Sequence, residues 1–528
     1  MRGERQHGMR WIFAALAVAA LTSCGGGGGG SVLPPTVLAQ SCSPNNPFRN
    51  DATAPITDGN IGTEKTWLRE YIDRNYLWYD KVPAVNASDP IYSNDTLLGF
   101  YESIDTYFLD LVQPLTNPPG KPEDKFSFIY PTAAWDALIN SGSTVGYGIE
   151  WHFASSTPPR NIRVAYVHPG STAQAKGILR GDTLVLADNV AADDNTQSGV
   201  DTLNAALFPA SGTNHSFRLS RAGTATAIDV SMTAGPVNLV PVPPATVLPV
   251  GGGQKVGYIL FNDHVLTAEA PLINAFSYLQ SQAVNDLVLD LRYNGGGYLY
   301  IASEVGYMIA GAARTTAAVP PNPFESTVFS SKRSSENSTA YFEDIACVPD
   351  AQTFNCTRSD PLPTLNLGRV YVLVSGSTCS ASEAIVNALR GVDVEVHLIG
   401  STTCGKPYGF FGQDNCGITY FPIEFQGVNA KGFGDYADGF TPANSGGTGY
   451  PLPGCAANDD LDHALGDPAE GQLAAALSYR ASGNTACLPV MASPRQSPLA
   501  AGQAAALSQG RVVKPVVLTN RNGRMPSR

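Results

Sequence analysis

The pattern of hydrophobic and polar positions divides the chain into regions of different character. Residues 64–83 and 97–111 have the apolar spacing of amphipathic helices. Between residues 144 and 236, short apolar runs alternate with turn residues, which predicts strands joined by tight turns. From about residue 254 several apolar runs are continuous, which is typical of strands buried on both faces of a sheet.

Helical stretches separate the continuous runs of the last region. The runs are KVGYILFND, DLVLDLR, RVYVLVSG and VEVHLIG, and helical patterns cover residues 268–281, 299–310 and 382–390. A further helical run, residues 469–481, closes this region. Alternation of buried strands and helices predicts a layered domain. The expected fold class is therefore α/β, with a β-rich domain and an N-terminal helical segment in front of the layered core.

The first residues have the composition of an export signal. Basic residues precede an apolar run from Trp11 to Leu21, which is too short to span a bilayer. The run ends in LTSC, which resembles a lipoprotein signal cut before a lipid-carrying Cys24; a plain secretory signal is the alternative. Residues 25–30 are all glycine and predict a flexible tether. By resemblance to Gram-negative lipoproteins, a chain without Asp after Cys24 is expected on the outer membrane, facing the periplasm.

The composition of the chain argues against one class of binding partner. The chain has 528 residues, 43% of them apolar, and a net charge of −12. It shows no cluster of Lys and Arg, so a nucleic-acid partner is not expected.

Export also changes how the nine cysteines are interpreted. Lipidation of Cys24 would leave an even number in an oxidising compartment, which favours disulfides. Cys347 and Cys356 bracket a short polar loop and are the simplest pair to predict. No Cys-x-x-Cys pair supports a zinc site, so no metal or cofactor is expected.

The β-rich region carries a possible peptide-binding loop. Its order of strand, Pro169-Gly170 turn, short helix, Gly181-Asp182 turn and strand resembles a PDZ domain of the bacterial, protease-associated kind. The resemblance implies that the loop of Gly146, Tyr147, Gly148 and Ile149 offers backbone N–H groups to a peptide's terminal carboxylate, while the peptide adds as a strand. A small β-domain without a peptide role is the alternative.

A serine in the last region stands where a nucleophile is useful. The segment VYVLVSGSTCSASEAIVNAL predicts a strand, a tight turn and a helix, with Ser380 at the turn. Amides at the start of a helix can stabilise an oxyanion. An ordinary helix-capping serine occupies the same position, so this segment alone does not decide its role.

Two other strand ends supply the remaining parts of such a site. The strand DLVLDLR ends in Asn294 followed by three glycines, whose backbone can approach a ligand closely. The strand VEVHLIG is followed by Gly405-Lys406. A lysine whose pKa is lowered by burial can act as a general base, and a Ser–Lys pair is a known alternative to Ser–His–Asp.

Together these motifs resemble the carboxyl-terminal processing (tail-specific) serine proteases. The motifs are DLRYNGGG (290–297), SASE (380–383) and Gly405-Lys406, and the resemblance covers roughly residues 60–485. It implies Ser380 as nucleophile, Lys406 as general base, and oxyanion donors from the N–H groups of Ala381 and Gly296. It also implies a ClpP/crotonase-like protease core and polypeptide substrates with apolar C-termini, cut near those ends while the PDZ domain holds the tail.

The expected domain organisation follows from these assignments. It comprises a signal peptide (1–24), a tether (25–58), a helical domain (59–143), a PDZ domain (144–236), a catalytic domain (237–485) and a disordered tail (486–528).

The sequence departs from the family around the lysine. Pro407 stands where a glycine is typical, and Phe410 stands where many members have a glutamine that bonds to the lysine. Gln413 is the remaining candidate to orient Lys406. Cys379 and Cys404 flank the two catalytic positions, either as a disulfide or as free thiols.

Other mechanisms and functions are open alternatives. A His-dependent mechanism is disfavoured, because His397 falls in a predicted strand and His463 in a polar segment. Because the surroundings of Lys406 differ from the family pattern, a second function is open: a catalytically weak, PDZ-containing envelope lipoprotein that binds peptides or acts as a scaffold. A binder of cell-wall or small hydrophobic ligands is a third possibility.

Overall fold

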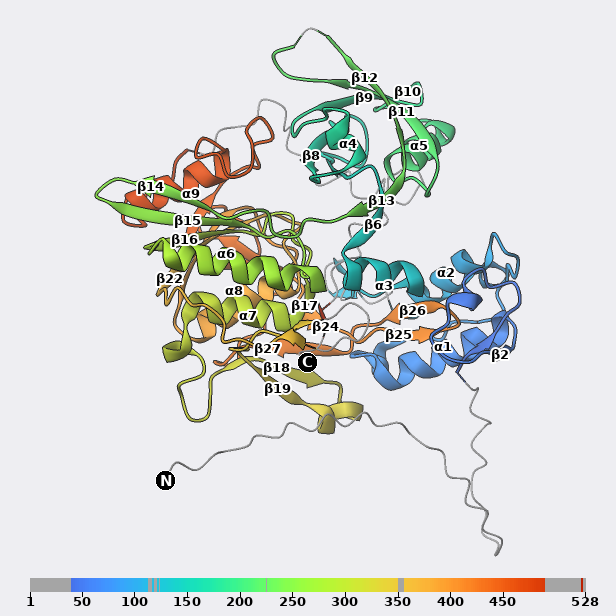
Figure 1. The fold of residues 1–528 in the computed structure, drawn as a ribbon. Helices are drawn as coiled ribbons and strands as arrows, with labels where there is room; N and C mark the ends of the chain where they lie inside the picture. Colours follow the sequence, from blue (N-terminus) through green and yellow to red (C-terminus); the bar gives the residue numbers. More distant parts are fainter. Residues whose placement is uncertain are drawn as a thin grey trace, which may run out of the picture.

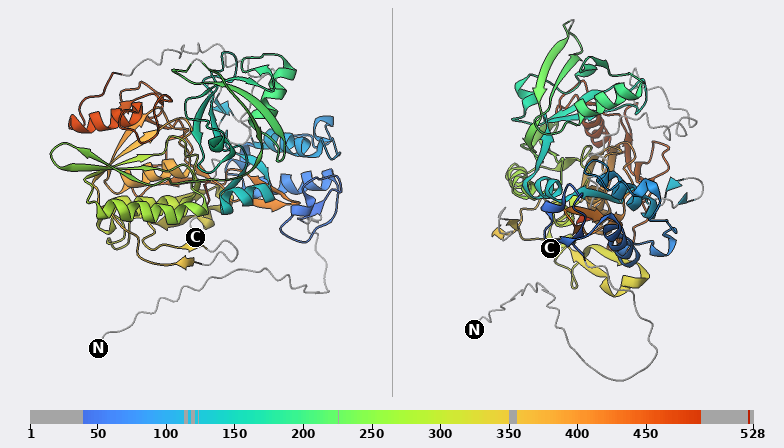
Figure 2. Two further views of the ribbon diagram at one scale, coloured as in Figure 1. Left: turned by 45° about the horizontal axis from the view of Figure 1, so that its top comes forward. Right: turned by 90° about the vertical axis from the view of Figure 1, so that its right-hand side faces the viewer.

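The computed structural model describes residues 39–112, 116–117, 121–122, 124–224, 226–349, 356–489 and 524–525. The predicted signal peptide with Cys24 lies outside them, as does most of the predicted tail. The described part forms a layered α/β core, an N-terminal segment packed beside it, and a β-rich unit above both (Figure 1). The right-hand view of Figure 2 also shows the β-rich unit above the rest of the fold. Among the described helices, none is long and apolar enough to cross a membrane.

A six-stranded sheet forms the centre of the core, and its parallel part confirms the predicted α/β class. The strand order is β14 (Thr246–Val250), β15 (Gln254–Leu260), β16 (Asp286–Asp290), β22 (Arg369–Val374), β23 (Glu395–Gly400) and β30 (Gly454–Ala456). Strands β15 to β30 run parallel, and β14 pairs antiparallel at the edge.

Helices cover both faces of this sheet. Val370, Val372 and Val374 of β22 pack in one core with α6 (Glu269–Ser281), α7 (Leu299–Ala310) and α8 (Ala381–Gly391). Tyr371 and Leu373 face the opposite way, onto α9 (Gly471–Ala481). Successive side chains of a strand point to opposite faces, so a strand covered on both sides must be apolar throughout.

The N-terminal segment packs into the same apolar core as the helices on one face of the central sheet. It contains α1 (Ile61–Asn75), α2 (Phe100–Val112), β5 (Phe128–Pro131) and α3 (Thr132–Ser141). Strand β5 pairs with β26 (Ile418–Phe421), which in turn pairs with β25 (Gln413–Asn415). The rings of Trp67 and Phe108 pack on Tyr420, with centroid distances of 5.3 and 6.1 Å.

Residues 39–58 are also part of the fold, contrary to the prediction of a flexible tether through residue 58. Strand β1 (Ser41–Cys42) pairs with β2 (Thr57–Asp58). Cys42 forms a disulfide with Cys416, and the Gln40 amide donates a hydrogen bond of 2.7 Å to Asn415 Oδ1. These contacts join residues about 375 positions apart, which local composition does not reveal.

The β-rich unit has its own apolar core. Its strands follow the order β12 (Ile228–Thr233), β11 (Asn214–Ser220), β9 (Thr183–Ala187), β8 (Arg163–Val167) and β7 (Ile149–His152), with α4 (Thr172–Ala175) and α5 (Gln197–Leu207). The pair β6 (Ser143–Gly146) and β13 (Gly235–Asn238) connects this unit to the core. Strand β7 is therefore an edge strand. The PDZ assignment of the unit stays a prediction.

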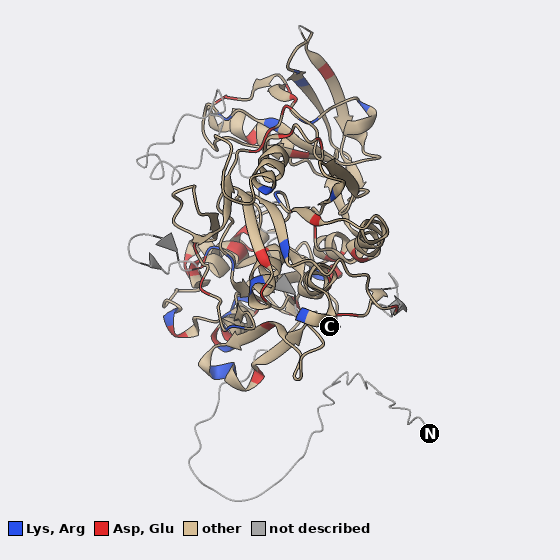
Figure 3. Ribbon diagram, turned by 90° about the vertical axis from the view of Figure 1, so that its left-hand side faces the viewer, with Lys and Arg blue, Asp and Glu red and all other residues tan. Residues whose placement is uncertain are grey.

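Shorter strands complete the fold. A second sheet has the order β19 (Ser338–Tyr341), β18 (Pro323–Phe329), β27 (Phe425–Val428) and β24 (Tyr408–Gly409). The others are β3 (Thr116–Asn117), β4 (Lys121–Pro122), β10 (Val190–Ala191), β17 (Gly297–Tyr298), β20 (Val348–Pro349), β21 (Cys356–Arg358), β28 (Phe440–Pro442), β29 (Tyr450–Leu452) and β31 (Arg524–Met525). Basic and acidic residues are interspersed over these elements in the view of Figure 3.

Disulfides join Cys379 to Cys404 and Cys455 to Cys487, besides the bond at Cys42. Cys347 is also disulfide-bonded, at the start of the hairpin of β20 and β21. The side chain of Cys356 lies outside the described set, so its predicted pairing with Cys347 stays a prediction.

Replacing Cys42 and Cys416 together by serine is expected to lower Tm, because the N-terminal strands lose their covalent link to the turn between β25 and β26. Loss of a native disulfide typically costs ~2–5 kcal/mol. Circular dichroism during heating would measure the change, with Ser88→Ala, at an exposed loop residue, as the control. Equal Tm values for both variants would show that the link does not stabilise the fold.

Candidate active site

Ser380 occupies the turn between β22 and α8, as the sequence predicts. Its backbone has φ 56° and ψ −116°, a conformation that costs a non-glycine residue about 1–3 kcal/mol. Its side-chain oxygen is buried and, within the described part of the chain, makes no hydrogen bond. A strained strand-to-helix turn is the arrangement that presents the nucleophile in serine hydrolases of the elbow type.

Asn294 fastens the glycine loop to this turn. Its main-chain oxygen accepts hydrogen bonds from Cys379 N at 3.1 Å and from Ser382 Oγ at 3.0 Å. The residues on both sides of Ser380 are therefore bound to one carbonyl group.

Gly296 lies directly against Ser380. A Cβ at this position would come within 2.8 Å of Ser380 Cβ and 3.0 Å of Ala381 N, and the residue has φ 100°. Only glycine satisfies both conditions without strain. The structure thus brings Gly296 and Ala381, the two predicted oxyanion residues, together beside Ser380. In this conformation the Gly296 amide donates to Asn294 Oδ1 at 2.9 Å.

Lys406 is completely buried in the loop after β23. Its Nζ lies 4.4 Å from the ring centroid of Phe410 and 5.2 Å from that of Phe126. Burial disfavours the ammonium form of an amine, whereas the ring faces attract a cation.

Gln413 is not the residue that holds Lys406 in this structure, which corrects the sequence-based expectation. Its side chain is exposed on β25 and donates to the main-chain oxygen of Asp414 at 3.0 Å. Phe410, at the position where the family typically has glutamine, instead places its ring against the lysine. An aromatic contact therefore replaces the expected amide at this point.

The carboxylate of Glu383 joins the serine turn to the lysine loop. It is fully buried and accepts hydrogen bonds from Ser380 N (3.0 Å), Lys406 N (2.8 Å), Gly405 N (2.9 Å) and Thr403 Oγ1. Burial raises the pKa of Glu383, and these hydrogen bonds oppose that shift. The sequence alone did not reveal this bridging role.

A disulfide makes the same connection covalently. Cys379 precedes Ser380, Cys404 precedes Lys406 by two residues, and their Cα atoms lie 5.2 Å apart. The two sulfurs lie close to the Glu383 carboxylate, in a grouping that could otherwise hold a metal ion. Since they are bonded to each other, they offer no thiolate ligands in this form.

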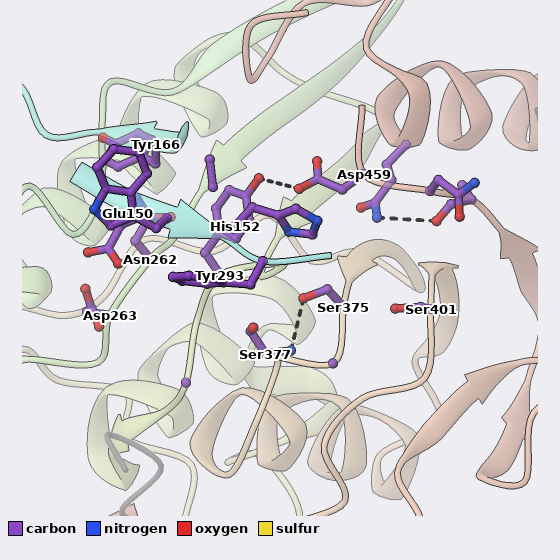
Figure 4. Close-up of a pocket in the computed structure, with 18 of the residues that line it drawn as sticks. Glu150, His152, Tyr166, Asn262, Asp263, Tyr293, Ser375, Ser377, Ser401 and Asp459 are labelled. Atoms are coloured by element: carbon purple, nitrogen blue, oxygen red, sulfur yellow. Dashed lines mark hydrogen bonds between the residues drawn. The ribbon is translucent and has the colours of Figure 1, made fainter. Parts of the chain in front are cut away.

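A cavity of about 580 Å³ opens beside the serine turn, between the β-rich unit and the core. It is lined by Glu150, His152 and Tyr166 from β7 and β8, and by Asn262, Asp263, Tyr293, Ser375, Ser377, Ser401 and Asp459 from the core (Figure 4). Most of the core residues follow the carboxyl ends of parallel strands, where α/β folds bind ligands.

An ionic network crosses from the β-rich unit to the glycine loop. Arg180 Nη2 lies 2.6 Å from Asp459 Oδ1, and Arg292 Nη1 lies 2.8 Å from the same oxygen. Tyr293 donates to Asp459 and accepts from Arg180. Burial raises the pKa of Asp459, but the two guanidinium groups outweigh burial and hold this pKa at about 2. Residues that precede the glycine loop are thus tied to the β-rich unit.

The predicted peptide loop lines a second cavity, of about 430 Å³. Gly146, Tyr147, Gly148 and Ile149 connect β6 to the edge strand β7, opposite the end of α5. Gly148 has φ 82°, and a Cβ there would lie 2.2 Å from Ser171 Cβ, so the loop requires glycine at this position.

A buried histidine that the sequence analysis did not single out also belongs to this site. His264 Nδ1 lies 2.9 Å from Asn294 Oδ1, the atom that also binds Gly296 N. Burial lowers the pKa of His264 to about 3, so the ring is neutral at physiological pH. The sequence feature that could have identified His264 is its position just after the carboxyl end of β15. His397, by contrast, stacks on Tyr371 in the core, and His463 is exposed.

Substituting Glu383→Gln is expected to destabilise the fold by ~1–3 kcal/mol, because the new amide NH₂ group faces backbone donors instead of accepting from them. Chemical unfolding followed by circular dichroism would measure this difference. The matched control is Glu102→Gln, at an exposed position of α2. If both variants unfold alike, the carboxylate is not the connection described above.

Comparisons with known proteins agree with this architecture. Residues 255–409 match the model of peptidase family S41, and residues 63–128 match the peptidase S41 N-terminal domain. The carboxyl-terminal-processing protease of Picosynechococcus sp. is 29% identical over 269 residues, which cover 51% of this chain and 56% of that protein. The chloroplastic carboxyl-terminal-processing peptidase 2 of Arabidopsis thaliana is 26% identical over 254 residues, 46% of each chain. The match thus spans about half the length of these relatives.

A crystal structure supports the fold. The putative S41 protease of Bacteroides fragilis superposes with a TM-score of 0.56 at 23% identity, over 80% of this chain and 98% of that one. The resemblance seen in the sequence is confirmed. The models of the S41 N-terminal domain and of peptidase family S41 thus match this chain one after the other, at residues 63–128 and 255–409.

Proposed function

We propose that the protein is a serine endopeptidase that cuts polypeptides near their carboxyl termini, with Ser380 as nucleophile and Lys406 as general base. The observation that carries the proposal is the Glu383 carboxylate, which binds the backbone of both residues. Two loops that share one buried carboxylate are held at a fixed separation, as a catalytic pair requires.

The reaction follows from these positions. Ser380 Oγ attacks the scissile carbonyl carbon while Lys406 Nζ, as a neutral amine, takes the hydroxyl proton. The oxyanion of the tetrahedral intermediate accepts hydrogen bonds from the N–H groups of Ala381 and Gly296. Lys406 returns its proton to the leaving amine, and the same lysine then activates the water that hydrolyses the acyl-enzyme.

The described conformation is a resting state in this proposal. Ser380 and Lys406 are both fully buried, and the Gly296 amide is bound to Asn294. Catalysis therefore needs a movement that frees this amide and admits the substrate. The network from Arg180 to the residues before the glycine loop supports the β-rich unit as the source of that movement.

The β-rich unit is the proposed holder of the substrate tail. Strand β7 has one unpaired edge, and the loop of Tyr147 and Gly148 stands at its start, beside α5. A peptide that adds along this edge with its carboxylate at the loop is bound in the PDZ manner. An apolar last side chain fits the second cavity, which is lined by Leu138, Leu207 and Phe208.

We further place the protein in the cell envelope, anchored by lipid at Cys24. The disulfides of the described fold support export, since such bonds persist in oxidising compartments.

Ser380→Ala and Lys406→Met are each expected to lower kcat/KM for a protein substrate with an apolar C-terminus by ~10⁴-fold or more, because removal of a nucleophile or its base abolishes acyl transfer. Mass spectrometry of the products would measure turnover. Ser88→Ala and Lys431→Met, at exposed positions, are the matched controls. Undiminished cleavage by either active-site variant would refute the dyad. Tail binding without turnover by the parent protein would instead favour the peptide-binding scaffold.

Amidating the substrate's C-terminus is expected to raise KM by about tenfold with little change in kcat, because a held carboxylate contributes a charge-assisted hydrogen bond. Steady-state kinetics on paired peptides would separate the two constants. Acetylating the N-terminus of the same peptide serves as the control and should change neither. Equal KM values for the amide and the acid would argue against carboxylate capture.

A further inference from the structure

The last strand of the fold comes from the far end of the chain. Residues 524 and 525 form β31, which runs parallel to β17, with Arg524 opposite Gly297 and Met525 opposite Tyr298. Strand β31 also contacts β24 and α7.

This position lies between the two halves of the candidate active site. Strand β17 begins directly after Gly296, which packs against Ser380. Strand β24 begins two residues after Lys406. A segment that pairs with β17 and contacts β24 therefore passes between the loop that carries an oxyanion residue and the loop that carries the base.

The length and charge of the tail suit this position. The 34 residues between Pro489 and Arg524 can extend over ~110 Å, enough to return across the domain. From residue 490 onward the chain has six basic residues and no acidic one, although the whole chain carries a net charge of −12. The opposite signs of the tail and of the chain as a whole favour this occupant.

We propose that the carboxyl-terminal segment of this chain binds its own cleft as a strand on β17 and competes there with substrate. The proposal rests on the proposed function, because it takes this cleft as the substrate site. Backbone pairing holds the segment whatever its side chains, as in strand addition. Because the segment belongs to the same chain, its effective concentration at the cleft is high, so even a weak site is largely filled.

Binding of a labelled tail peptide tests the proposal without catalysis. The probe is a fluorescein-labelled decapeptide, TNRNGRMPSR, which corresponds to residues 519–528. Fluorescence anisotropy compares the complete Ser380→Ala chain with the same chain ending at Pro489. The shortened chain is expected to bind the probe at least ~10-fold more tightly, because its own tail no longer competes.

Point variants of the tail distinguish the loss of β31 pairing with β17 from the removal of the whole tail. The complete Ser380→Ala chain with Arg524→Pro and Met525→Pro loses both amide hydrogens of β31 and should bind the probe like the shortened chain. Gln503→Pro, elsewhere in the tail, should leave the competition intact.

Two results would overturn the proposal: equal binding to complete and shortened chains, or no binding to the shortened chain. Loss of the proposed function is detected separately, by cleavage assays on the parent protein, because these binding measurements need no turnover.

Discussion

The buried carboxylate of Glu383 is the interaction on which the candidate site depends. The serine turn and the lysine loop follow different strands, β22 and β23, and their backbones meet at this side chain. A hydrogen bond contributes ~0.5–1.5 kcal/mol, and leaving a buried acceptor unsatisfied is costly. Because both loops donate backbone hydrogen bonds to this one side chain, moving either loop would leave part of the side chain unsatisfied. The disulfide of Cys379 and Cys404 adds a covalent limit to their separation.

A second buried network gives the β-rich unit a connection to the same site. Arg292 bonds to Glu470 through two nitrogen atoms and also reaches Asp459, which Arg180 contacts from the other unit. A buried ion pair adds little stability over apolar packing, but breaking one partner away leaves an unpaired charge and is strongly unfavourable. Such a network favours discrete arrangements of the two units over gradual ones. This property suits a protein in which peptide binding to the β-rich unit is proposed to drive a movement at the candidate active site.

Much of this architecture could be predicted from local sequence patterns. The helix predicted over residues 299–310 is α7, and the continuous apolar runs are the buried parallel strands. The places of Ser380 at a strand–helix turn and of Gly296 in a loop after a strand could be predicted because both patterns are local. The order of residues 39–58 and the shared N-terminal core were missed, because they depend on contacts such as Cys42 with Cys416, across 374 residues. Gln413 was misassigned for a similar reason: distance along the chain did not show that β25 turns its side chain to solvent.

The positions of two disulfides bear on how long the protein survives. Cys42 lies near one end of the continuous described fold and Cys487 near the other, and both are bonded to interior segments, at Cys416 and Cys455. Chain ends are where proteins fray and where nicking begins. An exopeptidase that digests the chain from either end would reach a disulfide-bonded cysteine before it reaches the core.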